Sequence, residues 1–152
     1  VLISAASWGS GHTLMSNEHP DPTRTAATDM APRLFEMAGL GPEEIDVAEL
    51  YDCFTYSVLV QLEDYGFCAK GDGGAFVESG ATKIGGSLPV NTHGGFLSEG
   101  YVHGFNHIYE AVSQLRGDAG ARQVEGAKVA LSTAQAGYIS GNTSALILRG
   151  DS

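Results

Sequence analysis

Four short apolar segments of the chain have the pattern of β-strands. They are Val1–Trp8, Ile45–Tyr51, Lys128–Thr133 and Ser144–Arg149. The first is an apolar run with β-branched residues, which predicts a buried strand, and the second alternates apolar and polar positions. The last two lie close together in the sequence, so they are candidates for an antiparallel pair.

Between these strands, apolar residues recur at helical spacing. The first predicted helix begins at Asp21-Pro22, a capping residue followed by proline, and runs to Ala38, before Gly39. Pro32 lies inside it and predicts a kink or two short helices. The other two predicted helices cover residues 53–66 and 101–116. The last of them has its apolar residues on one predicted inner face, namely Val102, Phe105, Ile108, Val112 and Leu115.

Strands and helices alternate along the chain, apart from a glycine-rich stretch at 69–100. This order predicts an α/β fold in which helices cover a layered mixed β-sheet. With 152 residues, the chain 1–152 is expected to form a single domain. A loop as long as 69–100 inside a compact domain is usually functional.

Composition and charge narrow the classes of function. Hydrophobic residues make up 43% of the chain, which is too many for a disordered segment. A net charge of -10 argues against nucleic-acid binding. We also expect no membrane span, because no apolar run reaches the roughly 18 residues that a span needs. No leader peptide is expected either, because no charged region is followed by an apolar one. Cys53 and Cys68 are expected to be free thiols, as is typical of a cytoplasmic protein.

Most of the side chains that could carry chemistry are in the segment 91–107. It contains His93, Glu99, Tyr101, His103 and His107 among four glycines. One hypothesis is an active-site loop that delivers an acid or base to a helix N-terminus, where backbone N–H groups favour developing negative charge. The other is a solvated glycine-rich loop, and spacing alone does not choose between them.

Other candidate residues have a plain structural alternative. Tyr51 ends a predicted strand and Asp52 opens the next helix, at the end where α/β sheets bind ligands, although a buried tyrosine is more often part of a core. Cys53 is a nucleophile candidate, but a small buried residue is the simpler interpretation. His103 and His107 have the i, i+4 spacing of metal ligands but lack the glutamate of a zinc motif, so no metal site is expected.

Three motifs in this order resemble the C-terminal half of the thiolase superfamily. They are Asp46–Thr55, Asn91–Gly104 and the closing strand, glycine loop and strand. The resemblance is greatest to lipid-transfer or sterol-carrier-type thiolases and covers nearly the whole chain. It implies a thiolase-like C-terminal domain without the N-terminal half that carries the acylated cysteine.

The chain departs from ordinary thiolases at the residues that do their chemistry. Thiolases have Asn-Glu-Ala-Phe where this chain has Tyr51-Asp52-Cys53-Phe54, and Gly-His-Pro where it has Gly100-Tyr101-Val102. The second cysteine of thiolases has no counterpart in 132–138. A tyrosine at each of the first two positions resembles thiolase-like retro-aldolases of bacterial steroid side-chain degradation. These enzymes cleave a β-hydroxyacyl-CoA to a ketone and a shorter acyl-CoA.

The resemblance implies roles for particular residues. Tyr51 and Tyr101 are expected to make the two proton transfers, while His93 and His103 either lower a tyrosine pKa or hold the thioester oxygen. The expected substrate-binding residues are Asp52, Asn91, Gly94, Gly95 and Gly137. Coenzyme A enters as part of the substrate, and no cofactor or metal is expected.

The resemblance also implies partners, and it leaves two other functions open. The expected partners are an OB-fold and zinc-ribbon protein that binds acyl-CoA, an N-terminal thiolase half or companion subunit, and a second copy of the thiolase-like unit in a homodimer. One alternative function is an acyltransferase-type thiolase whose nucleophilic cysteine lies in the missing half. The other is a non-catalytic subunit that binds lipid or acyl-CoA.

Overall fold

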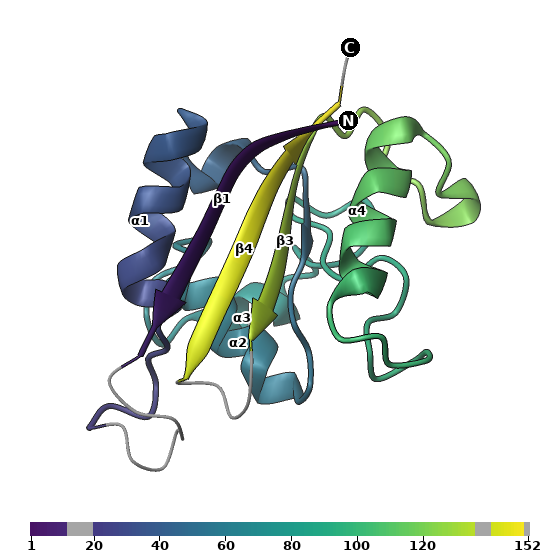
Figure 1. The fold of residues 1–152 in the computed structure, drawn as a ribbon. Coiled ribbons are helices and arrows are strands. Elements are labelled where there is room, and N and C mark those ends of the chain that lie inside the picture. The colour runs from purple at the N-terminus through teal and green to yellow at the C-terminus, as the bar shows by residue number, and fades with distance from the viewer. Residues whose placement is uncertain (12–19, 136–140, 151–152) are drawn as a thin grey trace.

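A computed structural model describes residues 1–11, 20–135 and 141–150 (Figure 1). Its strands are β1 (Leu2–Ser10), β2 (Val47–Glu49), β3 (Val129–Gln135) and β4 (Asn142–Arg149). Its α-helices are α1 (Ala27–Ala38), α2 (Thr55–Asp64), α3 (Gly73–Glu78) and α4 (Phe105–Arg116). Short 3-10 turns lie at Pro42–Glu44 and Gly120–Arg122.

The four strands form one mixed sheet in the order β1-β4-β3-β2. β4 runs antiparallel to both of its neighbours, whereas β2 is parallel to β3. At the outer side of β2, Val90 makes an isolated parallel bridge with Ala48. The predicted fold class, a layered mixed sheet with helices, is confirmed, and so is the antiparallel pair at the end of the chain.

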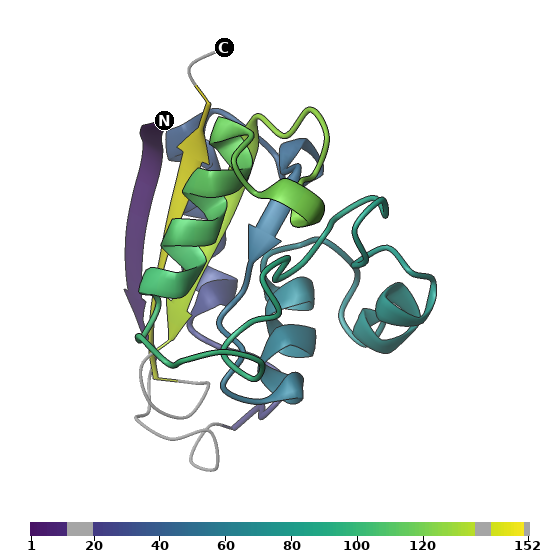
Figure 2. The ribbon, with the colours of Figure 1, turned by 90° about the vertical axis from the view of Figure 1, so that its right-hand side faces the viewer.

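Helices cover the two faces of the sheet unequally (Figures 1 and 2). Along β3 and β4, Leu131 and Ile147 join the larger apolar cluster, with α1, while Ala130 and Leu148 join a smaller one, with α4. Alternate residues of a strand point to opposite faces, so α1 and α4 lie on opposite sides of the sheet. α4 packs on β3 and β2 and leaves β1 uncovered on its side.

The first strand forms as predicted, but the prediction that it is buried is wrong for this chain. Leu2, Ile3 and Trp8 are 65%, 66% and 61% exposed. β1 lies at the edge of the sheet, and α1 packs against only one of its faces. β1 therefore has the apolar sequence of a buried strand, although α1 covers only one of its two faces.

The predicted helices exist, with later starts and one extra element. α1 begins at Ala27 and continues through Pro32 as one helix, because Pro32 is exposed and the carbonyl it leaves unpaired can bond water. The predicted loop 69–100 contains the short helix α3. α4 begins at Phe105 because His103 and Gly104 have positive φ angles, of 43° and 95°. Tyr101 therefore belongs to the loop before this helix.

The inner face of α4 also differs from the predicted one. Its buried residues are His107, Glu110, Ala111 and Gln114. Val102 and Phe105, which were expected to face inward, are exposed, and Ile108, Val112 and Leu115 are half-buried. Polar side chains thus fill the space between α4 and β2. No helix in the described residues is long and apolar enough to cross a membrane.

Candidate active site

Tyr51 directly follows β2, and its backbone is fixed from two other elements. Its N–H donates to Thr133 Oγ1 in β3 at 2.9 Å, and its carbonyl accepts from Gln61 Nε2 in α2 at 2.7 Å. Thr133 Oγ1 in turn donates to Gln61 Oε1 at 2.6 Å. This closed set of hydrogen bonds holds Tyr51, which is 7% exposed, at the end of the strand.

Tyr101 reaches Tyr51 from the loop before α4. The Tyr101 hydroxyl donates to the Tyr51 hydroxyl at 2.6 Å, although the residues are 50 positions apart in sequence. The Phe96 ring lies beside both, with centroids 5.3 Å from Tyr51 and 4.4 Å from Tyr101. The contact satisfies the geometric requirement of a tyrosine pair; the two catalytic roles remain predictions.

The surroundings of Tyr101 favour its neutral form. Partial burial, the hydrogen bond with Tyr51 and the nearby Cys53 and Asp52 all raise the pKa of Tyr101 above its usual value. These effects all act in the same direction, and the roles suggested for His93 and His103 remain predictions. Any proton transfer by Tyr101 therefore begins from the protonated hydroxyl.

Asp52 anchors the glycine-rich loop beside the tyrosines. Its carboxylate accepts from the backbone N–H of Phe96 at 2.9 Å and lies 3.5 Å from His107 Nε2. Burial opposes the charged form, but His107 and the amides of Phe96 and Leu97 outweigh it and lower the pKa of Asp52. A Cβ added at Gly95, whose φ is +71°, would lie 2.0 Å from Asp52 Oδ2. Only glycine lets the loop approach this closely.

Asn91 and His107 secure the residue before Tyr51. Asn91 accepts from the Leu50 N–H at 2.7 Å and donates to the Leu50 carbonyl at 2.9 Å. His107 Nε2 donates to the same carbonyl at 2.7 Å and is fully buried. The backbone of neighbouring residues thus engages the polar atoms of Asn91 and Asp52, and their expected contact with substrate remains a prediction.

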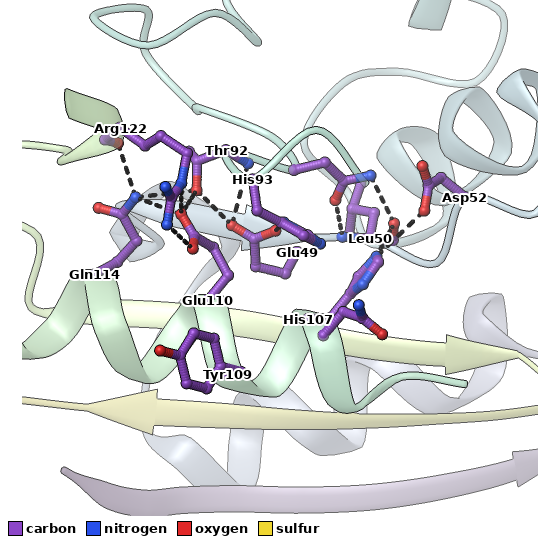
Figure 3. Close-up of polar contacts among 12 residues, drawn as sticks. Glu49, Leu50, Asp52, Thr92, His93, His107, Tyr109, Glu110, Gln114 and Arg122 are labelled. Atoms are coloured by element: carbon purple, nitrogen blue, oxygen red, sulfur yellow. Dashed lines mark hydrogen bonds and ion pairs between the residues drawn. The ribbon is translucent and has the colours of Figure 1, made fainter. Parts of the chain in front are cut away.

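A second set of polar contacts joins the loop to β2 and α4 (Figure 3). His93 Nδ1 pairs with Glu49 Oε2 at 2.9 Å, and His93 Nε2 pairs with Glu99 Oε1 at 3.2 Å. Glu49 is fully buried in β2. Burial of the imidazole opposes its charged form, but Glu49, Glu99 and Glu110 outweigh this and raise the pKa of His93.

The same network continues to the far end of α4. The Thr92 hydroxyl lies 2.9 Å from Glu49 Oε1 and 2.7 Å from Glu110 Oε1. Arg122 pairs with Glu110 at 2.9 Å, and Gln114 donates to Glu110 at 3.0 Å. Burial opposes the charge of Glu110, but Arg122, Thr92 and Gln114 lower its pKa overall. The buried carboxylates of Glu49 and Glu110 thus each have a partner among the described residues.

Two hollows lie on this side of the site, and both are lined by Trp8 and His103. One of about 350 Å³ is lined by Trp8, Tyr51, His103 and Ser144, among others. A more apolar groove of about 420 Å³ runs from Trp8 to Phe105 and also reaches His103. Of the predicted site residues, the structure therefore brings Tyr51, Tyr101 and His103 together. His93 instead faces carboxylates, and Gly137 lies outside the described residues.

Several important side chains were not recognised from the sequence: Glu49, Thr92, Asn106, Glu110, Gln114 and Arg122. Two sequence patterns could have indicated the most buried of these side chains. Glu49 shares its strand face with Val47 and Tyr51, since alternate residues point the same way. His107, Glu110 and Gln114 are spaced as one stripe of a helix.

The sequence and the fold can be compared with known proteins. The family model described as "Thiolase C-terminal domain-like" matches residues 9–149. The chain belongs to this family. In the described part of this thiolase-like domain, no group of three or more His, Cys, Asp or Glu side chains could hold a metal ion.

The relatives of this thiolase-like chain include lyases and a transferase. It is 42% identical to the 17-hydroxy-3-oxo-4-pregnene-20-carboxyl-CoA lyase of Mycobacterium tuberculosis, over 97% of the chain and 38% of the lyase. It is 45% identical to a steroid side-chain-cleaving aldolase of Thermomonospora curvata, over 77% of the chain and 31% of the aldolase. It is 43% identical to an acetyl-CoA acetyltransferase of Methanothermobacter thermautotrophicus, over 86% of the chain and 35% of the transferase.

A solved structure described as an Ltp2-ChsH2(DUF35) aldolase superposes with a TM-score of 0.90 at 41% identity. The match covers 99% of this chain and 39% of that one. A monomeric SCP2-thiolase-like protein of Mycobacterium smegmatis, at 19% identity, shares the fold with a TM-score of 0.69. The thiolase-like chain thus spans well under half the length of the relatives it matches.

Gly95→Ala should destabilise the loop by about 1–3 kcal/mol, because the new methyl group strains the positive φ and displaces the Asp52 carboxylate. The free energy of unfolding of the full-length protein and hydrogen exchange of the Phe96 amide would measure this. Gly74→Ala is the matched control, because Gly74 lies in α3 with nothing within 4 Å of an added Cβ. Equal stability of the two variants would show that the close approach to Asp52 is unimportant.

Replacing His93 by Gln should reduce stability in a pH-dependent way. A raised pKa in the folded state means that the charged imidazole stabilises fully below about pH 6.5, and that this contribution is lost as pH rises through the raised value. The difference in unfolding free energy between wild type and His93→Gln should therefore be largest in acid. In a Glu49→Gln background this pH dependence should shrink. A difference that grows with pH would contradict the pairing.

Proposed function

We propose that the protein containing this chain is a carbon–carbon lyase. It would cleave a β-hydroxyacyl-CoA of a steroid side chain by a retro-aldol reaction, to give a ketone and a shorter acyl-CoA. The observation that carries the proposal is the 2.6 Å contact between the hydroxyls of Tyr51 and Tyr101 beside an open hollow. The lyase and aldolase names of two relatives support the same reaction.

The two hydroxyls can act as a proton relay. Tyr101 takes the proton of the substrate β-hydroxyl as its own proton passes to Tyr51, and Tyr51 protonates the α-carbon. Meanwhile the C–O bond becomes the ketone carbonyl, and the broken carbon–carbon bond supplies the electron pair of the thioester enolate. The donation from Tyr101 to Tyr51 has the direction that this relay needs. Because each oxygen gains a proton as it loses one, no standing phenolate is required on Tyr101, whose pKa is raised.

The developing enolate oxygen needs hydrogen-bond donors in the same hollow. We propose His103 for this role, because it lines both hollows and its ring lies 4.9 Å from that of Tyr101. Asp52, Asn91, Gly94 and Gly95 then shape the loop around the reacting atoms, and His93 acts on the loop through its two carboxylates. Coenzyme A takes part as the substrate thioester, and the relay itself uses no cofactor.

Exposed apolar side chains on α4 and β1 support an interface with another polypeptide. Phe105 and Tyr109, on the outer side of α4, are 70% and 73% exposed, and Trp8 in β1 is also exposed. An apolar surface of this kind marks an interface. We propose that the N-terminal half of a thiolase-like unit covers it, that this unit forms a homodimer, and that an OB-fold and zinc-ribbon subunit binds the acyl-CoA. The name of the matched two-protein aldolase supports such a subunit. A cytoplasmic location stays a prediction.

The acetyltransferase relative supports a second candidate function. It is 43% identical to this chain, which is close to the identities of the lyases. In that case a cysteine elsewhere in the protein would form an acyl-enzyme, and Tyr51 and Tyr101 would have other roles. Phenylalanine substitutions at Tyr51 and Tyr101 separate the two functions.

Tyr51→Phe and Tyr101→Phe should each lower the rate of retro-aldol cleavage by about 10²–10⁴-fold, as expected for a lost general acid or base. Substrate affinity should change little, because both rings remain. The double variant should be far less than additive, since the two transfers serve one cycle. Steady-state kinetics of the full-length enzyme would measure these effects.

Two variants serve as controls for the tyrosine pair. Tyr56→Phe removes a hydroxyl that bonds Pro22 at the surface, and Cys53→Ala removes a thiol that contacts Ser57. Both should keep near-normal turnover. Loss of activity in Cys53→Ala with both active-site Phe variants active would restore a cysteine mechanism.

The chain produced alone should self-associate, because Phe105, Tyr109 and Trp8 are exposed among the residues that the structure describes. The double variant Phe105→Lys/Tyr109→Lys should be more monomeric, since it adds charge to that surface. Sedimentation velocity over a range of concentrations would compare the two. A wild-type chain that stays a stable monomer at every concentration would refute the proposed companion surface.

A further inference from the structure

One side chain holds the backbone on both sides of Tyr101. Asn106 Oδ1 accepts from the N–H of Val102 at 3.0 Å, and Asn106 Nδ2 donates to the carbonyl of Gly100 at 2.8 Å. These two groups belong to the two peptide bonds that flank the Cα of Tyr101. Nδ2 also donates to Glu99 Oε1 at 2.7 Å, which uses its second hydrogen.

Few other hydrogen bonds hold the backbone of residues 99–102. In the described part of the chain, the other hydrogen bond to the backbone of residues 99–102 runs from the Phe105 N–H to the Val102 carbonyl. Gly100 has no atom within 4 Å of where a Cβ would lie, and His103 and Gly104 have positive φ angles. Without Asn106, the loop could therefore turn Tyr101, which is 44% exposed, away from Tyr51.

The Asn106 carboxamide is itself oriented by the buried network. Glu99 Oε1, which accepts from Asn106, also pairs with His93 Nε2, and His93 Nδ1 pairs with the buried Glu49. Glu99 can only accept, so it fixes which end of the carboxamide carries the donors. The chain Glu49–His93–Glu99–Asn106 thus connects β2 to the backbone around Tyr101.

We propose that Asn106 is a positioning residue that keeps the Tyr101 hydroxyl on Tyr51. The inference deepens the proposed function, because it assigns a residue that acts through Tyr101 without touching the substrate. A change of the order of 1 Å in a reacting group can cost about 10²-fold in rate, so the loss of Asn106 should act on turnover more than on binding.

Steady-state kinetics of Asn106→Ala in the full-length enzyme with its companion subunit are the first test. The kcat should fall by about 10²-fold, while KM stays within a few-fold. Ser113→Ala, which removes a hydroxyl on the same helix, should match wild type. An unchanged kcat in Asn106→Ala, with Tyr101→Phe impaired, would overturn the proposal.

The pH dependence of kcat in Asn106→Asp distinguishes the hydrogen-bond role from a purely structural one. An aspartate near the start of α4 favours the helix, but as a carboxylate it cannot donate to Gly100 or Glu99. Its kcat relative to wild type should be low at pH 8 and should rise as the pH falls toward 5, because one shared proton restores a donor. A ratio that does not change with pH would contradict the hydrogen-bond role.

Two measurements without substrate keep this test separate from the proposed reaction. Hydrogen exchange at the Val102 amide should speed up in Asn106→Ala. The ¹⁹F NMR signal of 3-fluorotyrosine incorporated at position 101 should move toward its solvent-exposed shift. No change in either would overturn the positioning role. If Tyr101→Phe retains full turnover, the proposed relay fails instead, and these two measurements alone decide the role of Asn106.

Discussion

The site depends on the need to pair carboxylates that are buried at the end of β2. Glu49 is fully buried and Asp52 is 3% exposed. Charges taken out of water are tolerated only with ionic or hydrogen-bonding partners. The glycine-rich loop supplies them, with His93 for Glu49 and the Phe96 amide for Asp52. These contacts hold the loop against the end of β2. Tyr101, which lies near the end of the loop, is thereby placed next to Tyr51.

The same requirement explains why α4 turns a polar face inward. His107 donates to the Leu50 carbonyl at the end of β2, and Glu110 and Gln114 bond Thr92 in the loop beside this strand. Hydrophobic burial alone would have turned Phe105 inward. In this structure the electrostatic demand of the strand end decides the rotation of the helix, and the apolar residues are left facing outward.

Much of the architecture could be predicted because it follows from local periodicity. The four strands, the mixed sheet and the order of elements come from runs such as Lys128–Thr133, and the pairing of Tyr51 with Tyr101 follows from the resemblance to retro-aldolases. The start of α4 could not be predicted, since the positive φ of His103 leaves no mark on residue type. Trp8 is exposed because β1 is an edge strand, and an apolar run does not distinguish an edge strand from a central one. The Glu49–His93–Glu99 chain joins β2 to the loop segment at 91–107, and spacing along the sequence cannot connect these two segments.

The pairing of β1 with β4 has a consequence for how the sheet is made. Among the described strands, β1 bonds only to β4, in a register that joins Leu2 to Arg149. Closing so long a loop is entropically costly, and contacts between distant residues slow folding. During synthesis, β1 cannot make this pairing until β4 has left the ribosome. The exposed face that suits β1 for assembly thus also makes the nascent chain prone to aggregation.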